Sequence, residues 1–141
     1  MNAVVTNEQI IQSFLRDFQG ELRSFRGLFG RILFPRAPSE GYVQQFAKAD
    51  ERGRMAGEVV RLWRVTASSI EELSTSFQIP GGVRRSRRFY PFAAFAICLP
   101  DDSGVGAVSS CLGPRWGHGQ RFSIVTEAGG WRIEWKGGWM S

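Results

Sequence analysis

Four arginines lie within five positions of the chain and could bind an anion. They are Arg84, Arg85, Arg87 and Arg88, with Tyr90 shortly after them. A planar guanidinium makes bidentate contacts to phosphate or carboxylate, and a neighbouring aromatic ring can stack on a base. On an extended strand Arg85 and Arg87 point one way while the other two fall on the opposite side or in a turn, so the four form no single flat surface. We predict that this segment contacts a protein partner or a second copy, with a nucleic acid, a ligand pocket or a solvated strand edge as the alternatives.

Acid and base groups are sparse outside the expected helices. Asp101, Asp102 and His118 are the candidates there, and His118 is the only histidine of the chain. The histidine lies in the glycine-rich stretch GPRWGHGQ, which predicts a loop without a catalytic role. Zinc requires three or four ligands at recognisable spacing, and no dinucleotide or phosphate-loop motif is present. We therefore expect no catalytic residue, no metal site and no cofactor.

The two cysteines are expected to stay reduced. Cys98 lies within an apolar run, where a thiol is usually inert packing. If the chain turns at 101–104, Cys111 lies opposite Ala94 and roughly 13 Å from Cys98. A disulfide needs Cα atoms within about 7 Å, so this register excludes one. With no secretory pattern at its start, the chain is expected to be cytoplasmic.

The first half of the chain predicts two helices. Thr6 and Gln9 fit a capping box. Apolar residues then recur at spacings of three or four, at Ile10, Phe14, Phe18, Leu22, Phe25 and Phe29. A second, short helix is expected from Ser39 through Ala47. Acids interleave with the arginines of the first helix, which disfavours binding to an anionic membrane surface.

From Gly57 onward the pattern predicts strands. The expected segments are 57–65, 73–79, 88–99, 105–112, 121–128 and 131–139. Pro91 cannot donate to a sheet, which predicts an edge or a bulge there. If Gly129 and Gly130 form a two-residue turn in the last hairpin, Phe122 and Ile124 share a face with Ile133 and Trp135, whereas a three-residue turn changes that register.

Length and composition indicate one globular domain. The 141 residues fit a single core, with a helical part at 6–52 and a sheet part at 57–139. The hydrophobic content of 43% is enough to build that core. The net charge of +5 bears on solubility and non-specific binding more than on any one site. No apolar run approaches the length of about 18 residues that a membrane span requires.

The order of elements and the closing stretch GGWRIEW carry a family resemblance. Helices precede several strands, and Trp131, Arg132 and Ile133 stand on the last one. This arrangement resembles the nuclear transport factor 2-like, or cystatin-like, superfamily. The resemblance implies an α+β fold with two N-terminal helices packed on a curved antiparallel sheet of five to six strands, shaped like a cone. A cystatin-like single helix wrapped by a meander is the alternative.

The resemblance also implies a cone that some members use as an enzyme pocket and others as a dimerisation surface. The positions expected to point inward carry no acid and no His–Asp pair. We therefore predict a non-catalytic binding or assembly domain that contacts a protein partner or forms a homodimer through its sheet face. A small-molecule or enzymatic pocket and a nucleic-acid-binding role are the alternatives. The aromatic residues expected at an interface or pocket are Trp63, Phe95, Trp131, Trp135 and Trp139.

Overall fold

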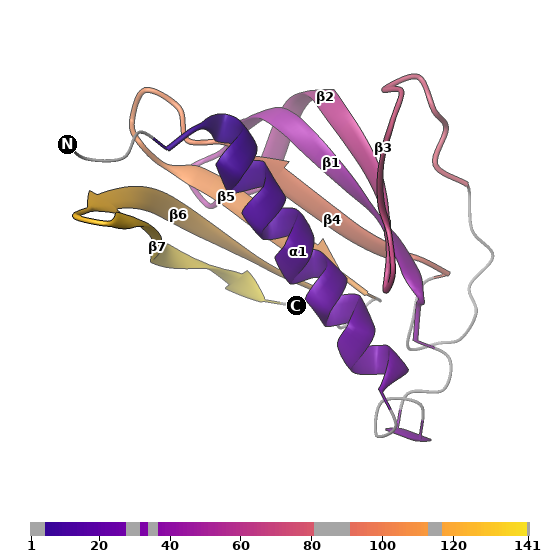
Figure 1. Cartoon of the computed structure of the whole chain (residues 1–141). Coiled ribbons are helices and arrows are strands. Elements are labelled where there is room, and N and C mark those ends of the chain that lie inside the picture. The colour runs from indigo at the N-terminus through magenta and orange to yellow at the C-terminus, as the bar shows by residue number, and fades with distance from the viewer. Residues whose placement is uncertain (1–4, 28–31, 34–36, 81–90, 113–116, 141) are drawn as a thin grey trace.

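The computed structural model describes residues 5–27, 32–33, 37–80, 91–112 and 117–140, which form one N-terminal helix and a seven-stranded sheet (Figure 1). The elements are α1 (Asn7–Arg26), β1 (Glu40–Ala49), β2 (Met55–Thr66), β3 (Ile70–Leu73), β4 (Ala93–Cys98), β5 (Gly106–Cys111), β6 (Gly117–Glu127) and β7 (Gly130–Met140). The strands lie in the order β3-β2-β1-β4-β5-β6-β7. The fold class is thus α+β, as the sequence predicts.

Helix α1 begins where the sequence predicts. Thr6 Oγ1 accepts a hydrogen bond from the backbone N–H of Gln9, and Gln9 Oε1 accepts one from the N–H of Thr6. This capping box satisfies two backbone donors that the first helical turn leaves without partners. The helix then buries the stripe Ile10, Ile11, Phe14, Leu15, Phe18 and Leu22 against one face of the sheet.

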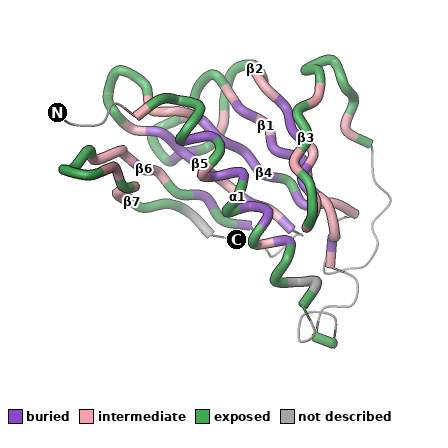
Figure 2. Tube along the Cα trace, in the orientation of Figure 1, coloured by how far each residue is buried: buried purple, intermediate pink, exposed green. Residues whose placement is uncertain are grey.

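The core lies between α1 and the central strands, as the buried segments of Figure 2 show. The rings of Phe18 and Phe95 stack with centroids 4.5 Å apart, and those of Phe14 and Phe122 lie 4.9 Å apart. Phe95 pairs in register with Val43 on β1, and Val43 pairs with Trp63 on β2. We call the side of the sheet that carries these residues the helix side, and the opposite side the outer face.

The expected second helix is wrong, because its residues form β1. This strand lies in the middle of the sheet, antiparallel to β2 and parallel to β4. Both of its faces are covered: Val43 packs under α1, while Tyr42 on the outer face contacts the rings of Phe77 and Phe92. A strand that is buried on both faces lacks the alternation of polar and apolar residues that would identify it. The sheet therefore begins at Glu40, inside the expected helical part 6–52, and has seven strands instead of five to six.

The hairpins of the second half agree with the sequence more closely. Cys111 lies opposite Ala94, as predicted, and no disulfide joins it to Cys98. Phe122 and Ile124 share a face with Trp135 and Ile133, also as predicted, although the two turn residues are 128–129. The strand expected at 73–79 is misplaced, because β3 is Ile70–Leu73. His118 belongs to β6 and not to a loop.

Candidate interaction surface

The two edges of the sheet differ in length. Strand β3 has four residues, and its Glu71 and Glu72 are held by Arg64 and Arg61 at 2.6 and 2.7 Å. Strand β7 has eleven residues, and among the described residues no strand lies beyond it. A short edge strand resists pairing with other chains, whereas a long one presents a longer row of backbone donors and acceptors. The β7 edge is therefore the one that is open to a further strand.

The turn between β6 and β7 determines which backbone groups point outward. Glu127 and Gly130 pair across the two-residue turn, in which Gly129 has a φ of 93°. Residues that flank such a turn exchange backbone hydrogen bonds, and the pairs alternate along the ladder. Arg132 and Glu134 therefore bond to β6. The N–H and C=O groups of Trp131, Ile133 and Trp135 point to the free edge.

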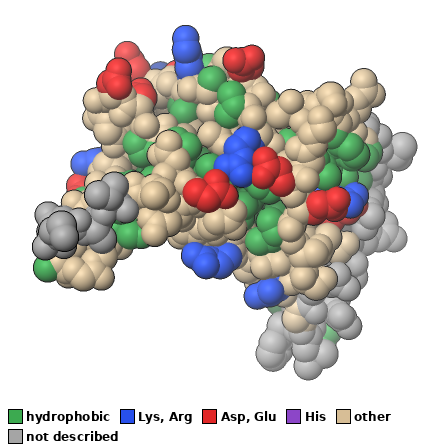
Figure 3. All heavy atoms as spheres, turned by 45° about the horizontal axis from the view of Figure 1, so that its top comes forward, with side chains coloured by type: hydrophobic (Ala, Val, Ile, Leu, Met, Phe, Trp, Pro, Cys, Tyr) green, Lys and Arg blue, Asp and Glu red, His purple; other side chains and the backbone are tan. Residues whose placement is uncertain are grey.

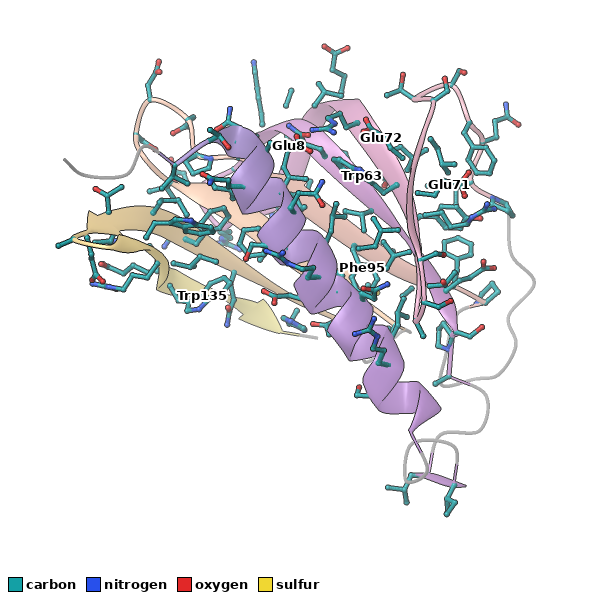
Figure 4. The ribbon with its side chains drawn as sticks, in the orientation of Figure 1. Glu8, Trp63, Glu71, Glu72, Phe95 and Trp135 are labelled. Atoms are coloured by element: carbon teal, nitrogen blue, oxygen red, sulfur yellow. The ribbon has the colours of Figure 1, made fainter. Side chains whose placement is uncertain are left out.

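An aromatic side chain stands beside this edge on the helix side. Trp135 is 48% exposed, although its ring centroid lies 6.2 Å from those of both Phe14 and Phe122. Ile124 and Ile133 pack partly buried against the core next to it. Figure 4 shows Trp135 on β7, apart from Trp63 and Phe95 on the strands behind α1. The indole is thus held in place by the core and remains accessible at the surface.

Charged side chains occupy the outer face of the same hairpin. Arg132 Nε donates to Glu127 Oε1 at 2.6 Å, and Lys136 Nζ donates to Glu134 Oε1 at 2.9 Å. The hydrogen bond from Lys136 lowers the pKa of Glu134, so this carboxyl stays ionised at neutral pH. The strand therefore presents apolar side chains on one face and alternating charges on the other. We call residues Gly130–Lys136, with both faces, the β7 surface.

A second group of polar residues lies where α1 crosses β5 and β6. Ser110 Oγ is 3.2 Å from both ring nitrogens of His118 and hydrogen-bonds Glu21 of α1. Burial raises the pKa of Glu21, and this is opposed by the charge of His118 and by the bond to Ser110. A serine, an imidazole and a carboxylate are the parts of a nucleophilic site. Ser110, however, is only 3% exposed, so the hydroxyl serves as a polar link between helix and sheet.

The sequence could not predict this group. Glu21 is distant from the other two residues in the chain, and Ser110 and His118 are brought together by the pairing of β5 with β6. The rarity of histidine was the one available signal, but the neighbouring glycines suggested a loop. Among the described residues, no three His, Cys, Asp or Glu side chains gather in a way that could hold a metal ion.

The outer face carries two hollows over the central strands. An apolar one of about 260 Å³ lies over Ala94, Ala96 and Ser109, with Phe46 and Met55 at its rim. A polar one of about 280 Å³ is lined by residues that include Asp50, Asp101, Arg121 and Cys98. Its two aspartates accept hydrogen bonds from their own turns, Asp50 from Arg52 and Arg54 and Asp101 from Ser103.

The thiol of Cys98 in the polar hollow is poorly suited to chemistry. Burial raises its pKa, and the nearby Asp101 adds to the effect. A thiol reacts as the thiolate, which a raised pKa makes scarce at neutral pH. The expectation of an inert, packed cysteine therefore agrees with its surroundings.

The structure separates the aromatic residues that the sequence grouped together. Trp63 and Phe95 are 2% and 1% exposed and belong to the core, so neither can anchor an interface on the outer face. Trp131 and Trp135 lie on β7, as does Trp139, whose side chain is outside the described part. The arginines Arg84, Arg85, Arg87 and Arg88 and also Tyr90 lie outside the described residues.

Charges on the face shown in Figure 3 are mixed, with acidic side chains beside basic ones. Within the described ranges, no helix has the length and apolar character to cross a membrane. No family model, curated protein or solved structure matches the chain.

Proposed function

We propose that this chain is a non-catalytic binding or assembly domain that associates with a protein through its β7 surface. The observation that carries the proposal is the long free edge of β7 beside the exposed ring of Trp135. An added strand gains affinity from main-chain hydrogen bonds and specificity from side chains next to the edge. Trp is also the residue type most enriched among those that dominate interface energies.

The burial of the candidate nucleophiles supports a role without catalysis. Ser110 and Cys98 are 3% and 5% exposed, and Glu21, Ser110 and His118 contact one another across the boundary between helix and sheet. A group in such a position contributes to packing and polar satisfaction. We therefore assign the interaction to the surface of the hairpin and not to these buried groups.

The resemblance to the nuclear transport factor 2-like superfamily is part of this proposal. It is supported by a helix packed on one side of a sheet and by the place of Trp131, Arg132 and Ile133 on the last strand. It implies a cytoplasmic docking or dimerisation domain. Nucleic-acid binding by Arg84 to Arg88 stays a prediction from the sequence.

The experiment compares two exposed aromatics at different places on the sheet, Trp135 on the edge strand β7 and Phe77 beside the central strand β1. Trp135→Ser removes the ring beside β7, and Phe77→Ser, the matched control, removes a ring that is 38% exposed near β1. We expect the wild-type chain to self-associate or to capture a partner, and the Trp135 variant to lose that association while the Phe77 variant keeps it. Light scattering gives the mass, quantitative affinity capture gives the partners, and circular dichroism checks the fold.

One result would overturn the proposal. In this result the wild-type chain is monomeric, and it captures the same proteins as the Trp135→Ser variant does. If Trp135→Ser fails to fold, the double variant Trp135→Phe with Ile133→Pro replaces it. The proline removes a backbone donor from the free edge.

A further inference from the structure

We propose that the partner of the β7 surface is a second copy of the chain, whose β7 pairs antiparallel with the first about a two-fold axis at Ile133. This inference rests on the proposed function and specifies its partner. The pairing places Ile133 opposite the copy's Ile133, Arg132 opposite Glu134, Trp131 opposite Trp135, and Gly130 opposite Lys136. It joins two seven-stranded sheets into one continuous sheet.

The backbone of β7 permits this register. The N–H and C=O groups of Trp131, Ile133 and Trp135 point to the free edge, as the pairing with β6 requires. Opposing Ile133 with its copy, and Trp131 with Trp135, makes three hydrogen-bonded pairs from groups that already point outward. The regular ladder of β7 with β6 runs from Gly130 to Trp135, because Lys136 is the extra residue where the register shifts between Arg121 and Phe122. Ile133 lies within that regular part, between Trp131 and Trp135, whose backbone groups point to the same free edge.

The charges on the outer face select this register over its neighbours. A two-fold axis at Arg132 opposes that arginine to itself, and an axis at Glu134 opposes two glutamates and sets Arg132 against Lys136. The axis at Ile133 instead forms two Arg132–Glu134 pairs. Opposite charges directly across an antiparallel ladder stabilise it, whereas like charges destabilise it.

An axis at Trp135 also pairs opposite charges, Glu134 with Lys136, but it fits the strand less well. That register opposes Arg132 to Gly138 and extends pairing across Gly137, which has a φ of 110° at the irregularity in β7. The two registers differ in whether Arg132 takes part. This difference makes them separable by experiment.

Arg132 and Glu134 each keep hydrogen-bonding atoms that are available to the second copy. Arg132 uses Nε to reach Glu127, and a guanidinium has four further N–H donors. Glu134 accepts from Lys136 at Oε1, which leaves Oε2 on the same carboxylate. The exposed fraction of these two side chains is 52% and 43%. They can therefore pair between copies without giving up the contacts within each chain.

The helix side of the interface brings apolar residues together. Ile133 packs against the core, and Trp135 contacts Phe14 and Phe122. Pairing the Trp131 of each copy with the Trp135 of the other covers the exposed indole. The two-fold axis stands perpendicular to the sheet, so both copies of α1 lie on the same side.

A charge-exchange experiment tests the register. Arg132→Glu alone opposes glutamates in the homodimer, and Glu134→Arg alone opposes arginines, so each should raise the dissociation constant about tenfold or more. A mixture of the two single variants restores two opposite-charge pairs, as does the double variant R132E/E134R. Sedimentation over a concentration series should show a monomer–dimer equilibrium for the wild type, the mixture and the double variant. Arg64→Glu with Glu71→Arg at the β3 edge is the matched control and should leave dimerisation unchanged.

A cysteine scan gives an independent readout. Ile133→Cys places two thiols across the axis, where hydrogen-bonded pairs have Cα atoms about 5.5 Å apart, within reach of a disulfide. Ile124→Cys, one strand further in, lies about three strand spacings, or roughly 14 Å, from its copy. Mild oxidation should cross-link the first variant and not the second.

The results distinguish this inference from the proposed function. The wild-type chain could be monomeric and still capture a different protein, with that capture lost in Trp135→Ser. This result would overturn the proposal of a second copy as partner and would leave the proposed binding function in place. If the wild-type chain is monomeric and Trp135→Ser changes none of the proteins that it captures, both the dimer and the proposed binding function are overturned. A dimer that is indifferent to R132E, or that the mixture fails to restore, overturns the axis at Ile133.

Discussion

Arg61 connects three elements on the helix side of the sheet. Its guanidinium donates to Glu8 at the start of α1 at 2.6 Å and to Glu72 on β3 at 2.9 and 2.7 Å. The same group lies 4.7 Å from the ring centroid of Trp63. These bonds lower the pKa of both Glu8 and Glu72. One side chain thus joins the helix to the short edge strand.

Arg61→Ala should lower the free energy of unfolding by about 1–2 kcal/mol. This sums two ion pairs of a few tenths of a kcal/mol each, reduced by solvent screening, and one cation–π contact. Because the pKa of each glutamate is lowered on folding, the contribution is present above their ordinary value of 4.5 and is lost as the pH falls below it. Urea unfolding at neutral and acid pH measures both effects.

Arg64→Ala is the matched control for this change. Arg64 makes an ion pair with Glu71 on β3 but has no bond to α1 among the contacts of the described residues. Arg64→Ala should therefore lower the free energy of unfolding by less than Arg61→Ala does. Equal losses for the two variants would contradict the role that we assign to Arg61.

Glu21→Gln should stabilise the protein at neutral pH. Burial raises the pKa of Glu21 above its ordinary 4.5, so folding favours the protonated carboxyl, and His118 and Asp17 are the titratable groups facing it. The stability that this group contributes is full below about pH 4.5 and is lost as the pH rises through the raised pKa. A neutral amide avoids that loss and can still accept a hydrogen bond from Ser110.

The measurement is the unfolding midpoint as a function of pH. The gain from Glu21→Gln should be absent at acid pH and should grow toward neutrality. Glu58→Gln, which changes an exposed carboxylate on β2, should show no comparable gain. A gain that does not depend on pH would count against burial of the charge as its cause.

At the scale of elements, the sequence was informative where an element buries only one face. The cap and the apolar stripe of α1 predict its start correctly, and the alternation in β6 and β7 predicts the shared face of Phe122, Ile124, Ile133 and Trp135. The β7 surface was therefore partly visible in advance, since both Trp131 and Trp135 were among the predicted aromatics. That β7 lies at an edge was not visible, because strand order is a tertiary property.

Strand β1 shows why the remainder could not be predicted. Its apolar residues Tyr42, Val43 and Phe46 are spaced as on a helix, because neighbours cover both faces of the strand. Local propensity is outweighed here by pairing with β2 and with β4, whose residues lie far along the chain. The position of Trp63 in the core depends on the same pairing.

Gly41 on β1 should tolerate no side chain. A Cβ there would lie 2.6 Å from Phe95 Cε2 and 2.9 Å from the carbonyl oxygen of Ala93. Gly41→Ala should therefore lower the free energy of unfolding by about 1–3 kcal/mol, the usual cost of overpacking. Gly20→Ala, the matched control, adds a Cβ with nothing within 4 Å on α1 and should raise stability by up to about 1 kcal/mol. Thermal unfolding of both variants checks the opposite signs.

At the scale of the whole molecule, the sheet consists of two meanders. Strands β1 to β3 form one and strands β4 to β7 form the other, each with neighbours in chain order. The parallel pairing of β1 with β4 joins the two, and α1 packs across the join through residues such as Phe18. Self-association through β7 would extend the second meander and leave this join untouched.

The pairing of β1 with β4 determines how long the folding chain stays exposed to aggregation. Gly41 pairs with Ala93, a separation of 52 residues, whereas the hairpins of each meander close over short turns. Contacts so distant in the chain form slowly. Until they form, the inner edge of β4, with its apolar stretch AAFAIC, remains open to other chains. The yield on refolding should therefore fall as protein concentration rises, and the strands responsible lie at the centre of the finished sheet and not at its edges.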